Sequence, residues 1–171
     1  MRCQGDITVR QARPDDAQEV SEILTEAAQW LAAEGIPLWD VADLGPERIL
    51  PEVADGLYFL AECDGHPVGT LRFQLEDALL WPDEPANESA FIHRLAVRRD
   101  YAGGAVANAM LDWAVNHTAQ LGRRFLRLDC DAGRAKLRRV YERFGFRYHS
   151  SRQVGAFRVA RYEHLVRGEE T

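Results

Sequence analysis

The chain has 171 residues, the size of a single domain with a substantial hydrophobic core. Hydrophobic residues make up 46% of it and charged residues 28%, as in ordinary water-soluble proteins, and the formal net charge is -6. This acidic balance argues against nucleic acid as the main partner, because phosphate binding requires clustered cations. No apolar run is long enough for a membrane span or a signal-peptide core, so we expect a cytoplasmic protein that does not bind a membrane.

Three cysteines, Cys3, Cys63 and Cys130, lie far apart in the sequence. Their spacing matches neither a metal site nor a framework of paired cysteines, so we predict no bound metal. Cys63 and Cys130 lie in strand-like runs, which predicts buried free thiols at both positions.

The first half of the chain predicts a strand, two helices and a hairpin. Apolar and polar residues alternate from Ile7 to Arg13, as in a half-buried strand. Pro14 and the two aspartates after it suit the first turn of a helix, whose apolar face continues until Gly35 stops it. The pair Asp64-Gly65 is a strong signal for a hairpin turn. Around it we expect, in chain order, a helix at 46–53 and strands at 57–63 and 67–75.

The second half predicts strands that alternate with helices, and Gly122 and Gly145 mark the two helix ends. The expected elements are a strand at 88–97, a helix at 103–119, a strand at 125–130, a helix at 134–144, and strands at 146–149 and 157–165. A hairpin followed by a strand-helix-strand crossover predicts an α/β (α+β) fold with a mixed central sheet of about seven strands and about four flanking helices. We expect one domain over residues 1–171, with frayed tails at 1–6 and 167–171.

The most informative stretch runs from Leu95 to Ala107. A buried strand ends there, a turn of small residues follows, and a helix begins. Such a turn directs several backbone N–H groups to one spot, where the helix dipole also favours a phosphate. The spacing fits neither a Walker nor a Rossmann motif. Two interpretations stay open: a phosphate-binding turn, or glycines that let a helix and a strand pack closely.

A second stretch, from Arg134 to Phe146, is a short amphipathic helix followed by glycine and an aromatic residue. By periodicity alone, Tyr141 on this helix suits a half-buried packing role. A tyrosine beside a thiolate leaving group can also act as a general acid.

Taken together, these motifs resemble the GNAT N-acyltransferase superfamily over nearly the whole chain. Their order and spacing carry the resemblance more than any single piece does. The matching pieces are Ile7-Thr8-Val9-Arg10 with Pro14-Asp15-Asp16, Asp64-Gly65 with Val68-Gly69, Leu95-Ala96-Val97 with Asp100-Tyr101 and Gly103, Leu126-Arg127-Leu128-Asp129, and Tyr141-Glu142-Arg143 with Gly145-Phe146.

The resemblance implies two splayed central strands, ending at Val97 and Cys130, and acetyl-CoA as the acyl donor, with no metal. It places Tyr141 as the acid that protonates the leaving thiolate and His93 as a base. The pantetheine arm would pair with the backbone of the first strand and the pyrophosphate would lie on the amides of the turn. The implied cofactor-binding residues are Leu95, Ala96, Val97, Ala102, Gly103, Gly104, Ala105, Val106, Ala107 and Arg134.

The sequence departs from the family pattern at several positions of this site. The family's turn has Gln or Arg, then Gly, then Gly or Ala. This chain has Ala102, Ala105 and Ala107 at these positions, of which only Ala107 agrees with the pattern. Arg134 replaces an Asn that is common seven residues before the tyrosine. Each change could weaken cofactor binding by about 1 kcal/mol, the contribution of one ordinary hydrogen bond.

The remaining candidates concern the acceptor and the base. His93 is the first choice for the base because the ordinary pKa of histidine suits proton transfer near neutral pH. Glu88 and Asp129 are the alternatives, and a carboxylate on a buried strand requires a partner. Aromatic rings with a carboxylate suit a cationic amine. The candidates for the acceptor site are Trp30, Trp39, Asp40, Trp81, Glu88 and Asp129.

The expected function is transfer of an acetyl group from acetyl-CoA to a primary amine of a small molecule. The departures in the turn also allow a catalytically weak acyl-CoA-binding or regulatory protein. Acetylation of a protein, or use of another acyl donor, is a further alternative. By resemblance only, we expect a homodimer.

Overall fold

The computed structural model describes residues 2–166, so the tail predicted at 167–171 lies outside the described residues. The chain forms two compact units, one of residues 2–73 and 94–111, the other of residues 74–93 and 112–166. Strand β4 (Ser89–Val97) and helix α3 (Ala105–Gln120) each pass from one unit into the other. Within residues 2–166, no helix combines the length and the apolar character that crossing a bilayer requires.

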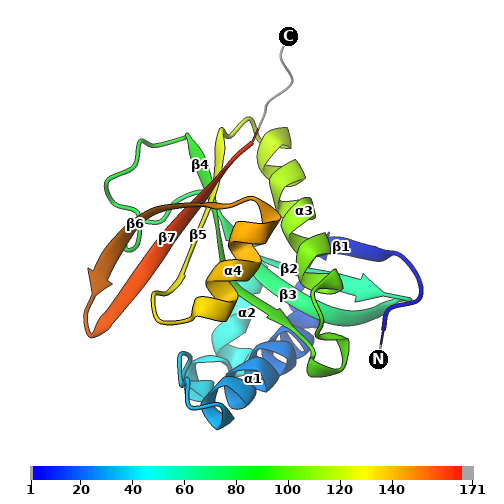
Figure 1. Ribbon diagram of the computed structural model, residues 1–171. Coiled ribbons are helices and arrows are strands. Elements are labelled where there is room, and N and C mark those ends of the chain that lie inside the picture. Colours follow the sequence, from blue (N-terminus) through cyan, green and yellow to red (C-terminus); the bar gives the residue numbers. More distant parts are fainter. Residues whose placement is uncertain (1, 167–171) are drawn as a thin grey trace. The chain divides into compact units, whose positions relative to one another are not determined.

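A three-stranded antiparallel sheet is the framework of the first unit (Figure 1). Its strands β1 (Ile7–Gln11), β2 (Tyr58–Cys63) and β3 (His66–Gln74) pair in that order. Between β2 and β3, φ is positive at Asp64 (52°) and Gly65 (79°), as a tight hairpin turn of the primed type requires. The predicted hairpin is confirmed.

Helices α1 (Ala17–Ala33) and α2 (Pro46–Ala54) pack against each other in the same unit. The short 3-10 helix η1 (Pro14–Asp16) precedes α1, and the Asp16 carboxylate accepts the backbone N–H of Arg13 at 2.7 Å. The apolar face predicted for α1 is buried in a core with residues of α2 and β2. This core includes Val20, Ile23, Leu24, Ala28, Ile49, Val53, Tyr58 and Leu60.

The second unit is built around strand β5 (Phe125–Asp131). The first three residues of β4 pair with β5 in parallel, and β7 (Phe157–Leu165) pairs with it antiparallel along its whole length. Strand β6 (Arg147–Val154) then pairs with β7, and Figure 1 shows the two as a long hairpin in orange and red. Helix α4 (Ala135–Phe144) ends at Gly145, whose φ of 125° suits glycine.

Strand β4 belongs to both sets of strands, and the order through it is β1-β2-β3-β4-β5-β7-β6. A mixed sheet of seven strands with four α-helices confirms the predicted fold class. Several predicted boundaries are wrong by one or more residues. The largest differences are at β6, which continues to Val154 rather than ending at His149, at β1, which ends at Gln11 rather than Arg13, and at α3, which begins at Ala105 rather than Gly103. Strand β6 is largely polar and has no buried residue, so alternation of apolar residues could not mark its end.

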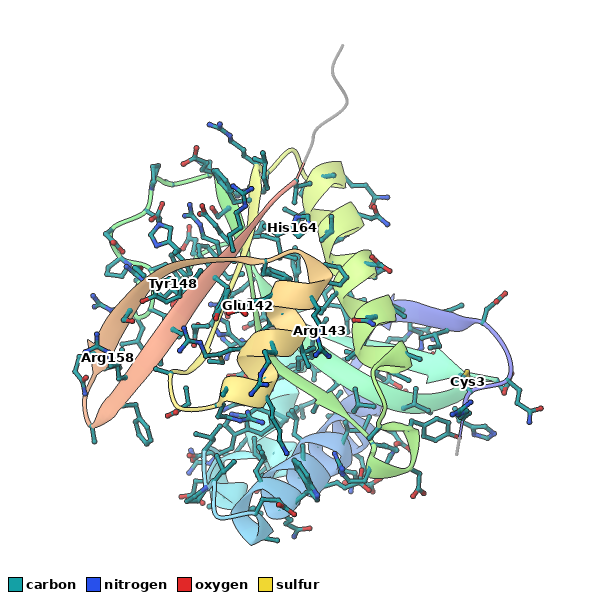
Figure 2. The ribbon with its side chains drawn as sticks, viewed as in Figure 1. Cys3, Glu142, Arg143, Tyr148, Arg158 and His164 are labelled. Atoms are coloured by element: carbon teal, nitrogen blue, oxygen red, sulfur yellow. A yellow bond between two sulfur atoms is a disulfide. The ribbon has the colours of Figure 1, made fainter. Side chains whose placement is uncertain are left out.

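The predicted free thiol at Cys63 is also wrong. Cys63 forms a disulfide with Cys3, and their Cα atoms are 5.8 Å apart (Figure 2). The register of β1 with β2 places Ile7 opposite Cys63, which brings the residues before β1 to the end of β2. Of the segment at 1–6 that was predicted to fray, the described residues 2–6 are therefore tied to the sheet at Cys3. The other predicted free thiol, Cys130, is free and buried.

Candidate active site

Strand β4 carries a local irregularity at Arg94, where φ is 51°. A left-handed conformation at a residue with a side chain costs about 1–2 kcal/mol and needs support from its surroundings. That support comes from the guanidinium of Arg94, which donates to the hydroxyl of Tyr58 at 2.9 Å within the first unit. The irregularity breaks the alternation of the strand, so that His93, Arg94 and Leu95 are all partly exposed in succession.

Beyond Arg94, one edge of β4 is committed to strand β3. The backbone N–H of Arg98 donates to a carbonyl of β3 at 2.8 Å. Because successive residues of a strand direct their N–H and C=O groups to alternate edges, those of Leu95 and Val97 lie on the opposite edge. The register with β5 covers only Ser89–Phe91. These peptide groups of Leu95 and Val97 can therefore pair with an extended ligand.

After β4 comes the 3-10 helix η3 (Arg99–Tyr101), and then the turn that leads into α3. Gly103 and Gly104 have φ of 134° and 103°, and a Cβ placed on either would meet no atom within 4 Å. These glycines are thus required by backbone conformation, and the close-packing interpretation is not supported. The first N–H groups of α3, from Ala105 on, have no acceptor within the helix, which favours an anion. The turn therefore fits a phosphate group.

Three ionisable side chains meet in the second unit: Asp77, His93 and Asp129. The Nε2 atom of His93 lies 2.9 Å from Oδ2 of Asp77, and its Nδ1 atom lies 3.7 Å from Oδ2 of Asp129. The side chains of Asp77 and Asp129 are only 5% and 11% exposed. Oδ2 of Asp129 is buried and accepts no hydrogen bond from the described residues. His93 is thus flanked by two buried carboxylates.

The two carboxylates have opposite pKa shifts. Burial raises the pKa of Asp129 to about 6, and the charge of Asp77 adds to the rise, while His93 and Arg161 oppose it. Burial also disfavours the ionised form of Asp77, but the hydrogen bond from His93 and backbone N–H groups outweigh it and hold the pKa of Asp77 below its ordinary value. Asp77 is therefore the ionised partner of His93, and Asp129 can exchange a proton near neutral pH.

The same three residues offer ligand atoms of the kind that a divalent cation uses, all within 4.8 Å of one another. Nε2 of His93 and Oδ2 of Asp77 lie at 2.9 Å, within the range of an N–H···O contact. The three side chains therefore form an ion-paired cluster around His93, and their donor atoms also lie close enough together to hold a cation.

Tyr141 lies on α4, is 6% exposed and packs its ring against Phe146 and Tyr162. Burial raises the pKa of its phenol, the nearby Cys130 thiol adds to the rise, and Arg134 opposes it. Tyr141 is therefore a neutral phenol over the physiological pH range, as a proton donor must be. Arg134 immediately precedes helix α4, and its positive charge lowers the pKa of the Tyr141 phenol.

The family model described as acetyltransferase (GNAT) family matches residues 20–146, more than half of the chain. The chain belongs to this family. It is 28% identical over 140 residues, 78% of each chain, to the uncharacterized N-acetyltransferase YesJ of Bacillus subtilis (strain 168). Among solved structures it resembles a GNAT-family acetyltransferase of Listeria monocytogenes 4b F2365, with a TM-score of 0.76 and 22% identity, covering 96% of this chain and 98% of that one. It also resembles YncA of Salmonella typhimurium, solved with its cofactor acetyl-CoA, with a TM-score of 0.70, 15% identity and 96% of both chains covered.

In this GNAT acetyltransferase, Glu88 lies away from the cluster around His93, whereas Trp81 adjoins it through its backbone N–H, which donates to the carbonyl of Asp77 at 3.0 Å. Glu88 precedes β4 by one residue, about 16 Å along the strand from His93, and its carboxylate pairs with Arg124 at 3.7 Å. Trp81 is 2% exposed, with the guanidinium groups of Arg127 and Arg161 at 5.0 and 4.7 Å from its ring centre. These surroundings favour structural roles for both.

The other candidates for the acceptor site of the acetyltransferase belong to the first unit. The ring of Trp30 lies 3.8 Å from the guanidinium of Arg99, and Trp39 packs against the core. Asp40 accepts the backbone N–H of Ala42 at 2.9 Å and so caps the short helix η2 (Val41–Asp43). Of the two tryptophans, Trp30 is the more exposed, at 38%.

The sequence analysis missed two residues of the acetyltransferase's candidate site. Asp77 lies in an irregular segment between β3 and β4, where no periodicity relates it to His93, and its only signal is a carboxylate in a loop beside a strand end. Arg94 takes a conformation that favours glycine, which its residue type conceals.

Proposed function

We propose that this GNAT acetyltransferase moves an acetyl group from acetyl-CoA directly to a primary amine of a small molecule. The observation that supports this most strongly is the gap between His93 and Asp129. A histidine nitrogen and a buried carboxylate oxygen, both acceptors, face each other 3.7 Å apart. A donor nitrogen about 2.9 Å from each could satisfy both. A cationic amine has such donors, and its charge matches the two carboxylates of the cluster.

In the proposed reaction, acetyl-CoA supplies a thioester carbonyl carbon and a thiolate leaving group. The bound ammonium first loses one proton to solvent, and the N–C bond of the resulting neutral amine then forms as the C–S bond breaks. His93 accepts the proton that the amine loses, with Asp129 sharing the positive charge, and Tyr141 holds the proton that the leaving sulfur requires. The cluster therefore removes a proton at one reacting atom and Tyr141 provides one at the other.

Acetyl-CoA binding is supported by the turn after β4 and by the acetyl-CoA in YncA. The peptide groups of Leu95 and Val97 would pair with the pantetheine arm, while those of Ala96, between them, face β3. The amides from Gly103 to Ala107 would hold the pyrophosphate, whereas the N–H of Ala102 already donates to the carbonyl of Arg99 at 3.2 Å. We expect Arg134, whose charge acts on the phenol of Tyr141, to contact the cofactor. The methyl groups of Ala102 and Ala105 belong to exposed residues, so they do not fill the turn. Cytoplasmic location and a homodimer stay predictions.

The test is release of free coenzyme A from acetyl-CoA with a panel of small primary amines and, in parallel, with unrelated peptides. We expect release with at least one small amine, and a kcat that falls about 100-fold or more in His93→Gln and in Tyr141→Phe. Trp113→Phe, on the unit-spanning helix α3, serves as an aromatic control. Turnover with peptides alone would make the protein acceptor the function, and binding of acetyl-CoA without turnover of any amine would favour the regulatory alternative.

A further inference from the structure

The segment between β3 and β4 holds the carboxylate of Asp77 in a fixed orientation. Its Oδ1 atom accepts the backbone N–H of Leu80 at 2.9 Å, and its backbone carbonyl accepts the N–H of Trp81 at 3.0 Å. With Oδ1 engaged in this way, Oδ2 is the atom that faces Nε2 of His93 at 2.9 Å. The two oxygens of one buried carboxylate thus have different partners.

This arrangement determines which nitrogen of His93 carries the proton. An ionised carboxylate can only accept hydrogen bonds, so the neutral imidazole beside it must bear its hydrogen on Nε2. The lone pair then lies on Nδ1, the atom that faces Oδ2 of Asp129 at 3.7 Å. A base needs a free lone pair directed at the proton it accepts. The alternative tautomer would direct an N–H group at that position instead.

We propose that Asp77 is a positioning residue that holds His93 in the Nε2–H tautomer, so that Nδ1 is the atom that accepts the proton of the acceptor amine. This inference rests on the proposed function, in which His93 is the base. Asp77 itself touches neither the amine nor the acyl group, and it acts only through His93.

The substitution Asp77→Asn tests this because the orientation of the new amide is fixed. The N–H of Leu80 requires an acceptor, so the amide oxygen takes the place of Oδ1 and the NH2 group faces Nε2. Nε2 must then accept, and the proton of the neutral ring moves to Nδ1. In serine proteases, the aspartate beside the catalytic histidine has been replaced by asparagine, which has the same shape. The histidine is then left in the wrong tautomer, and kcat falls by about 10,000-fold.

The experiment is nitrogen NMR of the folded protein labelled at its five histidines, in the presence of EDTA, with His93 assigned from the signal lost in His93→Gln. We expect the Nε2–H tautomer in the native protein and the Nδ1–H tautomer in Asp77→Asn. The control is Glu76→Gln, since Glu76 is the exposed neighbour of Asp77. It should leave the His93 signals unchanged.

Kinetics complete the test. Asp77→Asn should lower kcat about 100-fold with little change in KM for acetyl-CoA, and it should add little to the loss in His93→Gln because both act through one group. A native Nδ1–H tautomer, or no change in tautomer in folded Asp77→Asn, overturns the inference and leaves the proposed function standing if His93→Gln is inactive. If the tautomer of His93 changes in Asp77→Asn while kcat stays at the native value, both the role of Asp77 in catalysis and the assignment of His93 as the base are overturned.

Discussion

At the scale of single residues, the charge of Asp129 has a consequence for stability. Its pKa is raised by burial to about 6, against an ordinary value of 3.8, so the folded state binds more protons than the unfolded state between these values. The contribution of Asp129 to the free energy of unfolding is therefore fully present below pH 3.8 and is lost as the pH rises through about 6. Because each pKa unit corresponds to about 1.4 kcal/mol, Asp129→Asn should stabilise the protein at pH 7.5 by up to about 3 kcal/mol.

Urea unfolding at pH 4 and pH 7.5 measures this effect. The variant and the native protein should differ least at pH 4, where Asp129 is protonated, and the variant should lose kcat at both values. Asp131→Asn is a matched control on the same strand, because an amide oxygen can still accept the N–H of Gly133 that Asp131 accepts at 2.9 Å. Asp77→Asn should have the opposite sign, since the pKa of Asp77 is held low and its ionised form stabilises the fold above that pKa. If Asp129→Asn instead destabilises the protein at pH 7.5, the negative charge of Asp129 must be stabilised by its neighbours in the folded protein.

At the scale of the elements, β3 approaches β4 and α3 closely at Gly69. A Cβ at this position would lie 2.8 Å from Sδ of Met110, 3.1 Å from the carbonyl oxygen of Ala96 and 3.2 Å from Cγ1 of Val106. The methionine can move, but the backbone of β4 cannot move without shifting the peptide groups of Leu95 and Val97, which we propose bind the cofactor. Gly69→Ala should therefore destabilise the protein by about 1–3 kcal/mol, the usual effect of overpacking, and weaken acetyl-CoA binding.

Thermal unfolding with and without acetyl-CoA separates the two effects of Gly69→Ala. Saturation with ligand at about 100 times Kd should raise the native stability by about 2.7 kcal/mol, and the rise should be smaller in the variant at the same concentration. Gly133→Ala is the control, because its Cβ would meet only a side-chain oxygen of Asp131, at 3.1 Å. An equal rise in Tm for both proteins would show that the cofactor does not depend on the position of β4.

The same scale explains what could be predicted from the sequence. The hairpin at Asp64-Gly65 and the end of α4 at Gly145 were predictable because turn and cap residues act locally. The fold class followed from the order of the elements. Asp77, by contrast, reaches His93 from an irregular segment, and the left-handed Arg94 has no local signal in its residue type. Of the candidate site, the strand end, the turn and His93 could be predicted, whereas the partners of His93 depend on tertiary packing.

At the scale of the whole molecule, the disulfide between Cys3 and Cys63 connects residues 60 positions apart. Closing a loop of that length removes unfolded-state entropy equivalent to about 4 kcal/mol, a large part of the 5–15 kcal/mol that is typical of a folded protein. Reduction, or Cys3→Ser, should therefore lower the free energy of unfolding by up to about 4 kcal/mol and Tm by several degrees. Cys130→Ala serves as a control because it leaves the disulfide intact, and equal Tm values with and without reductant would contradict the expectation.

The disulfide also bears on where the protein works, because the glutathione pool of the cytoplasm keeps most thiols reduced. Alkylation of the protein inside intact cells, followed by mass measurement, counts its free thiols. A count of three would place the working enzyme in a reducing compartment, with the segment before β1 held only by noncovalent contacts. A count of one, from Cys130 alone, would mean that the bond persists in the cell. Either the predicted cytoplasmic location would then be wrong, or burial of Cys63, at 2% exposed, would protect the bond from reduction. Reduction rates of the purified protein in glutathione then distinguish these two cases, since a protected bond would also resist reduction in vitro.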